Sequence, residues 1–158
     1  VTGGTFDKEY DEIKRALSFG KTHVPEMLRL GRSRLDARVS TLMMKDSLFM
    51  TSADRSRILA ACRRAAENGI VVTHGTDTMT KTAVVLGRGL SGKTVVLTGA
   101  MRPYRFGSSD GMFNLGSALS FASVLPPGVY VAMNGLCWPW DDVRKDRRRG
   151  VFVGRGRT

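Results

Sequence analysis

Residues 70–82 constrain the fold most strongly, because they place a strand, a polar turn and the start of a helix in direct succession. Ile70 to Thr73 is short, apolar and β-branched, which is typical of a strand covered on both faces. The turn that follows carries Thr76 and Asp77, and a helical pattern begins at Thr78. Open α/β sheets place their chemistry at such junctions. This stretch therefore predicts both a fold class and the position of a site.

The same alternation of apolar runs and helical patterns extends over most of the chain. It predicts an α/β fold with three layers, in which helices cover both faces of a mostly parallel sheet. Val1 and Thr2 resemble the end of a further strand. We expect strands at Arg38 to Met44, Ile70 to Thr73, Thr94 to Thr98 and Val129 to Met133, and helices at Ala53 to Ala66, Thr78 to Leu86, Met112 to Val124 and from Pro25.

The length of 158 residues suits one domain with a core of its own. We expect this domain to span residues 1–146 and to be followed by a Gly/Arg-rich tail at 147–158, with a short edge strand at Val151 to Val153. Cys62 and Cys137 have no metal-ligand or redox spacing, which favours reduced thiols and a cytoplasmic protein. No apolar run reaches the roughly 18 residues that a membrane span needs, and no signal-peptide pattern is recognised.

The net charge of +11 is concentrated near the end of the sequence. Residues 144–158 contain seven Lys or Arg residues and a single acid, Asp146. Such a segment attracts nucleic acid or anionic lipid through counterion release and screened Coulomb forces. Phe152 is its only aromatic residue, so the pattern predicts weak, salt-sensitive association without sequence-specific recognition.

Two more turns combine glycine with threonine, at residues 2–5 and 97–103. Hydroxyl nucleophiles need a nearby base and backbone N–H donors, so these turns favour attack on a carbonyl over hydride or phosphoryl transfer. Each motif taken alone also has a structural interpretation. Thr76 or Asp77 can cap a helix, Gly3-Gly4 can form an anion-binding turn, and Lys145 can be a solvated cation. The nucleotide-binding glycine spacings are absent.

Five motifs, taken in order, resemble the bacterial L-asparaginase/glutaminase family. The match covers that family's amino-terminal domain, and the chain is similar to the short, one-domain asparaginases. The resemblance implies hydrolysis of L-asparagine to L-aspartate and ammonia, with glutamine a weaker substrate. The motifs are Thr2-Gly3-Gly4-Thr5, His74-Gly75-Thr76-Asp77-Thr78-Met79, Thr98-Gly99-Ala100-Met101-Arg102-Pro103, Ser109-Asp110-Gly111 with Phe113-Asn114-Leu115, and Met133-Asn134.

The resemblance also implies roles for individual residues. Thr5 matches the nucleophile that forms an acyl-enzyme, and Tyr10 is the candidate for the activating tyrosine. Thr76, Asp77 and Lys145 match the family's second catalytic cluster. N–H groups of Gly4 and Thr76 would hold the oxyanion, Asp46 and Ser47 would bind the backbone end of the amino acid, and Asp77 would pair with its ammonium. The implied substrate-binding set is Gly4, Asp46, Ser47, Gly75, Ala100 and Met101.

This machinery requires neither a metal nor an organic cofactor, because every implied group belongs to the protein. Relatives associate as dimers and tetramers, so the resemblance implies a homodimer or homotetramer. An alternative is a catalytically weak asparaginase-like domain that acts as a binding module for nucleic acid or anionic surfaces through its basic tail. An ammonia assay beside a salt titration of binding distinguishes the two functions.

Overall fold

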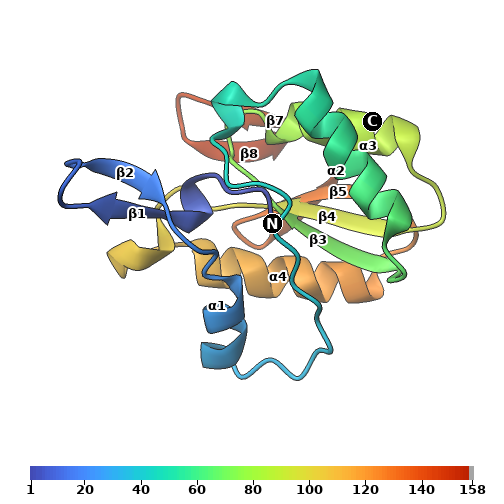
Figure 1. Ribbon diagram of the computed structural model, residues 1–158. Coiled ribbons are helices and arrows are strands. Elements are labelled where there is room, and N and C mark those ends of the chain that lie inside the picture. Colours follow the sequence, from blue (N-terminus) through green and yellow to red (C-terminus); the bar gives the residue numbers. More distant parts are fainter. Residues whose placement is uncertain (157–158) are drawn as a thin grey trace.

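The computed structural model describes residues 1–156, and its centre is a four-stranded sheet with the order β3-β4-β5-β6 (Figure 1). The first three strands are parallel, and β6 pairs antiparallel with β5. Every residue of β4 is buried, as its apolar sequence and central place require. The bounds are Gly69–Thr73 for β3, Thr94–Thr98 for β4, Gly128–Met133 for β5 and Leu136–Pro139 for β6.

Helices cover both faces of this sheet, as Figure 1 shows. α2 (Ser52–Arg64) and α3 (Met79–Gly89) lie on one face, and α4 (Gly111–Val124) lies on the other beside the short α1 (Val24–Leu30). α3 packs on β5, and α4 packs on β3, β4 and β5. The prediction of three layers around a mostly parallel sheet is confirmed, and the predicted strands after residue 69 and all four predicted helices form with small shifts at their ends.

The predicted strand at Arg38 to Met44 is wrong, because this segment belongs to no strand. It runs beside Val1–Gly4, to which it makes single backbone bonds, such as Leu42 N–H to Val1 O at 2.9 Å. Gly3 and Gly4 have φ values of 87° and 84°, and such a backbone turns away from the extended conformation. Pairing is therefore limited to one bridge, between Gly3 and Lys45.

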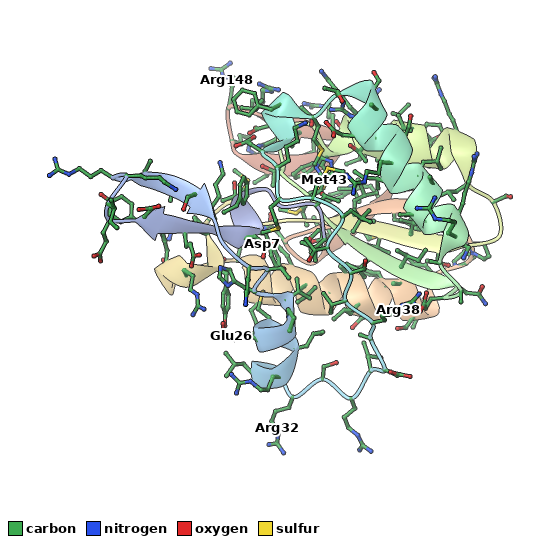
Figure 2. The ribbon with its side chains drawn as sticks, in the orientation of Figure 1. Asp7, Glu26, Arg32, Arg38, Met43 and Arg148 are labelled. Atoms are coloured by element: carbon green, nitrogen blue, oxygen red, sulfur yellow. The ribbon has the colours of Figure 1, made fainter. Side chains whose placement is uncertain are left out.

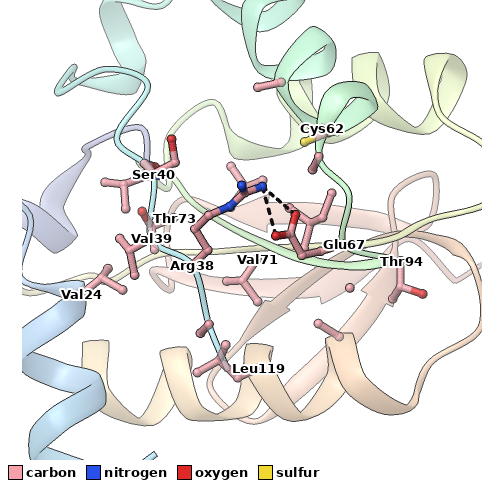
Figure 3. Close-up of a pocket in the computed structure, with 18 of the residues that line it drawn as sticks. Val24, Arg38, Val39, Ser40, Cys62, Glu67, Val71, Thr73, Thr94 and Leu119 are labelled. Carbon is pink, nitrogen blue, oxygen red and sulfur yellow. Dashed lines mark hydrogen bonds and ion pairs between the residues drawn. The ribbon is translucent and has the colours of Figure 1, made fainter. Parts of the chain in front are cut away.

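A cavity of about 1020 Å³ lies along the free edge of β3 between α2, α4 and the segment 35–42 (Figure 3). Arg38 and Glu67 form an ion pair of 3.0 Å across its mouth. Among the described residues, its lining includes none of the five predicted catalytic residues. The cavity is therefore distinct from the carboxyl-end edge of the sheet, where the site was predicted.

Two hairpins stand apart from the main sheet. The first joins β1 (Lys8–Asp11) to β2 (Ala16–Phe19) and projects from the body of the molecule in Figure 1. The second joins β7 (Val143–Asp146) to β8 (Val151–Gly154). The strand predicted near residue 151 thus forms, with β7 as its partner, and it places Phe152 in the main core. Residues 157–158 of the predicted tail lie outside the described residues.

Short 3-10 helices occur at Thr5–Asp7, Ser47–Phe49 and Tyr104–Phe106. The first adjoins the turn at residues 2–5 and the third follows the turn at residues 97–103, whereas the second begins at Ser47, one of the predicted substrate-binding residues. Within residues 1–156, no helix combines the length and the apolar character needed to cross a membrane.

Candidate active site

The turn after β3 brings a hydroxyl, a carboxylate and an amine together. The Lys145 ammonium donates to Thr76 Oγ1 and to Asp77 Oδ1, at 2.8 Å in both cases. Lys145 lies on β7, nearly 70 residues further along the chain than the turn. Its side chain is only 11% exposed, which holds the ammonium in place and strengthens both contacts. Thr76 is buried, whereas the Asp77 side chain is 41% exposed and keeps access to solvent.

The first Gly-Thr turn meets the second through their glycines. A Cβ on Gly4 would lie 2.3 Å from the backbone nitrogen of Gly75, so only glycine permits this approach. Thr5 begins the next 3-10 helix and is half-buried. Within residues 1–156, its hydroxyl makes no hydrogen bond. Thr5 and Thr76 therefore each follow one of two glycines whose backbones are in contact.

The predicted oxyanion donor at Gly4 is not available. The Gly4 N–H donates to Lys45 O at 3.0 Å, as part of the short pairing beside Val1–Gly4. The Thr76 N–H, in contrast, faces no protein acceptor within the described part of the chain. Of the two predicted donors, the Thr76 N–H is the one left for a ligand.

The third turn closes on the second from the other side. A Cβ on Gly99 would lie 2.3 Å from His74 O, and Ala100 is buried in the same core cluster as Phe6, the neighbour of Thr5. Asp110 fixes the turn by accepting hydrogen bonds from the N–H groups of Met101 and Arg102 at 3.0 and 3.1 Å.

Asn114 completes this support. Its Nδ2 donates to Gly99 O and to Asp110 Oδ2, both at 2.9 Å, and its Oδ1 accepts from Asn134 N–H at 2.8 Å. One buried amide thus ties the turn after β4 to the turn after β5. The sequence analysis used Asp110 and Asn114 only as family motifs, and nothing in their spacing alone revealed this role.

Asp46 and Ser47 lie beside the second turn, each with partners of its own. Ser47 is fully buried, and a Cβ on Gly75 would lie 2.6 Å from its Oγ. Asp46 accepts from the Lys8 ammonium at 2.5 Å and from Leu48 N–H at 2.9 Å. Partial burial raises the pKa of Asp46, but the Lys8 and Leu48 hydrogen bonds outweigh it and lower the pKa overall. Lys8 was missed by the sequence analysis.

Tyr10 is the predicted site residue that the structure does not bring into the cluster. It lies on β1 in the projecting hairpin and is 55% exposed. The base of that hairpin is fixed by Asp7, which lies where the hairpin joins the body in Figure 2. Asp7 Oδ1 accepts from His23 N–H at 2.9 Å and from the Thr22 hydroxyl at 3.0 Å. Burial raises the pKa of the Asp7 carboxyl.

His74 was treated in the sequence analysis only as part of a motif, yet it is completely buried, two residues before Thr76. Its Nδ1 lies 2.8 Å from Gly75 O, and its Nε2 lies 2.8 Å from the Thr82 hydroxyl on α3. Burial lowers the pKa of His74 to about 4. Within residues 1–156, no group of three or more His, Cys, Asp or Glu side chains is arranged to hold a metal ion.

Fold and site together define a three-layer α/β protein whose candidate site groups come from the carboxyl ends of neighbouring parallel strands and from one added hairpin. The chain belongs to the asparaginase family, since residues 1–151 match the model of the asparaginase N-terminal domain.

Individual relatives agree with this assignment. L-asparaginase 2 of Escherichia coli (strain K12) is 40% identical over 112 residues, which cover 68% of this chain and 31% of that protein. A Glutamyl-tRNA(Gln) amidotransferase component from Aeropyrum pernix is 36% identical over 146 residues, or 84% of this chain and 33% of that protein.

The fold agrees as well. The solved structure of the thermostable L-asparaginase from Thermococcus kodakarensis superposes with a TM-score of 0.84 at 30% identity, covering 99% of this chain and 50% of that one. The chain thus spans about half the length of that solved structure and about a third of the two curated relatives.

Proposed function

We propose that the chain is an amidohydrolase that converts L-asparagine to L-aspartate and ammonia, with glutamine a weaker substrate. The observation that carries the proposal is the Lys145 ammonium, held at 2.8 Å from both Thr76 Oγ1 and Asp77 Oδ1 at the carboxyl end of β3. Family membership supports the same reaction class. The relatives named for a tRNA amidotransferase leave a different amide substrate as the competing possibility.

In the proposed first step, Thr5 Oγ attacks the side-chain amide carbon of the substrate. The oxyanion accepts from the Thr76 N–H, the C–N bond breaks, and the nitrogen leaves as ammonia with the proton from Thr5. Tyr10 is proposed to take part in removing that proton, which requires the hairpin to move toward Thr5. The product of this step is a threonyl ester.

In the second step, water attacks the ester carbonyl and regenerates the Thr5 hydroxyl. Because the Thr76 oxygen accepts from Lys145, its own proton is free to bond elsewhere, and we assign the Thr76–Lys145–Asp77 cluster to holding this water and transferring its proton. Ser47, Gly75 and the turn at Ala100–Met101 would line the substrate. The exposed part of the Asp77 carboxylate would pair with the substrate ammonium.

The proposal is tested by ammonia release from asparagine in Thr5→Ala, Thr76→Ala and Lys145→Met variants. Each should lower kcat by about 100-fold or more, because Thr5→Ala removes the proposed nucleophile and the other two substitutions remove groups that position and transfer a proton. Lys93→Met is the matched control. Lys93 also binds oxygen acceptors, but it lies before β4, at the opposite end of the sheet, and its loss should leave kcat unchanged. Full activity in Thr5→Ala would remove Thr5 from its role.

A binding module is the second candidate function, favoured by three consecutive exposed arginines, Arg147 to Arg149, in the turn between β7 and β8. Figure 2 shows Arg148 pointing away from the body of the protein. Absence of ammonia release from asparagine and glutamine, together with steeply salt-dependent binding to nucleic acid or anionic vesicles, would favour this function over hydrolysis.

A further inference from the structure

His74 connects helix α3 to the peptide bond that precedes Thr76. Thr82 on α3 and His74 after β3 are both completely buried, so neither side chain can exchange its partner for solvent. The His74 imidazole lies between Thr82 and Gly75, with Nε2 2.8 Å from the Thr82 hydroxyl and Nδ1 2.8 Å from Gly75 O. A continuous hydrogen-bonded chain therefore runs from α3 to the backbone of the active-site turn.

The chemistry of these partners fixes the tautomer of the ring. A carbonyl oxygen can only accept a hydrogen bond, so Nδ1 must carry a proton. Burial of His74 disfavours a second proton on the ring, because it would create a desolvated charge. Nε2 is therefore an acceptor, and the Thr82 hydroxyl donates to it.

This contact also determines the direction of the Thr76 N–H. The chain has no cis peptide bonds among its described residues, and the C=O and N–H of a trans peptide point in opposite directions. With Gly75 O bonded to the His74 ring, the Thr76 N–H points away from that ring. It is the same N–H that lacks a protein acceptor.

Glycine makes this restraint necessary. Gly75 has to be glycine because a Cβ there would lie 2.6 Å from Ser47 Oγ and 3.1 Å from Ser47 N. Without a Cβ, the backbone at this position has access to more than one orientation of the following peptide. Packing thus explains why residue 75 is glycine, but it does not fix the orientation of the peptide between Gly75 and Thr76. A hydrogen bond is needed to fix it.

We propose that His74 is a positioning residue. Its Nδ1–H holds the Gly75 carbonyl turned inward so that the Thr76 N–H faces the reacting carbonyl, and Thr82 keeps the ring in the tautomer that this requires. The inference rests on the proposed amide hydrolysis for its kinetic consequence. The tautomer and the carbonyl contact hold independently of any reaction.

The kinetic test compares two substitutions of the same residue. His74→Phe removes the Nδ1–H and should lower kcat for asparagine by about 100-fold, the usual cost of one oxyanion donor, with KM changed less than about threefold. His74→Asn offers an amide N–H near the position of Nδ1 and should recover kcat to within about tenfold of the original protein. Thr82→Val should have a kcat between those of the two His74 variants, and Thr82→Ser should retain activity.

A kcat for His74→Phe equal to the original, or no better activity in the Asn variant than in the Phe variant when both keep the original circular-dichroism spectrum, would overturn the proposal. Misfolding of the Phe variant does not remove the test, because the second measurement uses the unsubstituted protein.

The second measurement is the nitrogen NMR spectrum of histidine-labelled protein. The sequence contains only two histidines, so a His23→Gln variant assigns the signals. We expect a neutral His74 ring at pH 7 with its proton on Nδ1. A proton on Nε2, or a charged ring, would overturn the inference. If the original protein releases no ammonia but shows the expected tautomer, the proposed function fails while the positioning of the Gly75 carbonyl stands.

Discussion

At the scale of single residues, the side chains of the site differ greatly in how readily the sequence alone identifies them. Thr76 and Asp77 lie in a strand-to-helix turn, where local sequence already predicts chemistry. Lys145 lies in a run of basic residues and could be singled out only through its family context. His74 and Lys8 could not be assigned at all, because their roles depend on burial and on partners distant in sequence.

The stability of the protein should depend on pH through His74. Its pKa is lowered to about 4 in the folded state, against about 6.5 in an unfolded chain. Between these values the unfolded state binds more protons, so stability is lost as the pH falls from about 6.5 to about 4. The loss is on the order of 3 kcal/mol, and it should be absent from His74→Asn.

Urea unfolding at pH 7, 5.5 and 4 measures this effect as the difference between the original protein and His74→Asn. Titrating groups common to both proteins, including Asp7, cancel in that difference. Parallel losses of stability in the two proteins would show that His74 is not the group responsible.

At the scale of elements, local rules explain where helices begin and end. α2 starts at a capping box, in which the Thr51 hydroxyl accepts from Asp54 N–H at 3.2 Å and the Asp54 carboxylate accepts from Thr51 N–H at 2.7 Å. Arg63 and Arg64 lie in the last turn, where positive charge is favourable. The segment 38–44 shows the opposite case, because a strand requires a neighbouring strand and a local pattern does not provide one.

Thr51→Ala should therefore lower the free energy of unfolding by about 1 kcal/mol, since it removes the acceptor for an N–H in the first turn of α2. Thr51→Ser keeps that acceptor and serves as the control. Chemical denaturation of both variants is the measurement, and ammonia release should be unchanged in both. Equal stability of the Ala and Ser variants would contradict the capping role.

At the scale of the whole molecule, exposed arginines lie in regions that are far apart. Arg147 to Arg149 occupy the turn of the second hairpin, and a Cβ on Gly150 in the same turn would lie 3.7 Å from Met101. This hairpin therefore borders the candidate active site. Arg32 lies at the other side of the molecule, beyond α1, as Figure 2 shows.

Binding to single-stranded DNA should weaken as salt rises, with a slope of about 0.7 in log–log terms for each phosphate contact. Replacing Arg147, Arg148 and Arg149 together by Ser should reduce that slope by about 2. The matched control replaces Arg29, Arg32 and Arg34, which are also exposed and carry the same charge. An equal reduction in both triple variants would show that binding follows the net charge and has no preferred surface.

The sequence by itself determined the fold class and most elements after residue 69, because hydrophobic periodicity and turn residues act over a few neighbouring positions. The strands β6 and β7 were not predicted, since each exists only as the antiparallel partner of another strand. The sequence also located the turns that carry Thr5, Thr76 and Ala100. The tertiary structure decided which groups meet: Lys145 with Thr76, Gly4 with Gly75, Lys8 with Asp46, and His74 with Thr82. These contacts join residues from different elements, and burial sets their strength, so they exist only once the layers have packed.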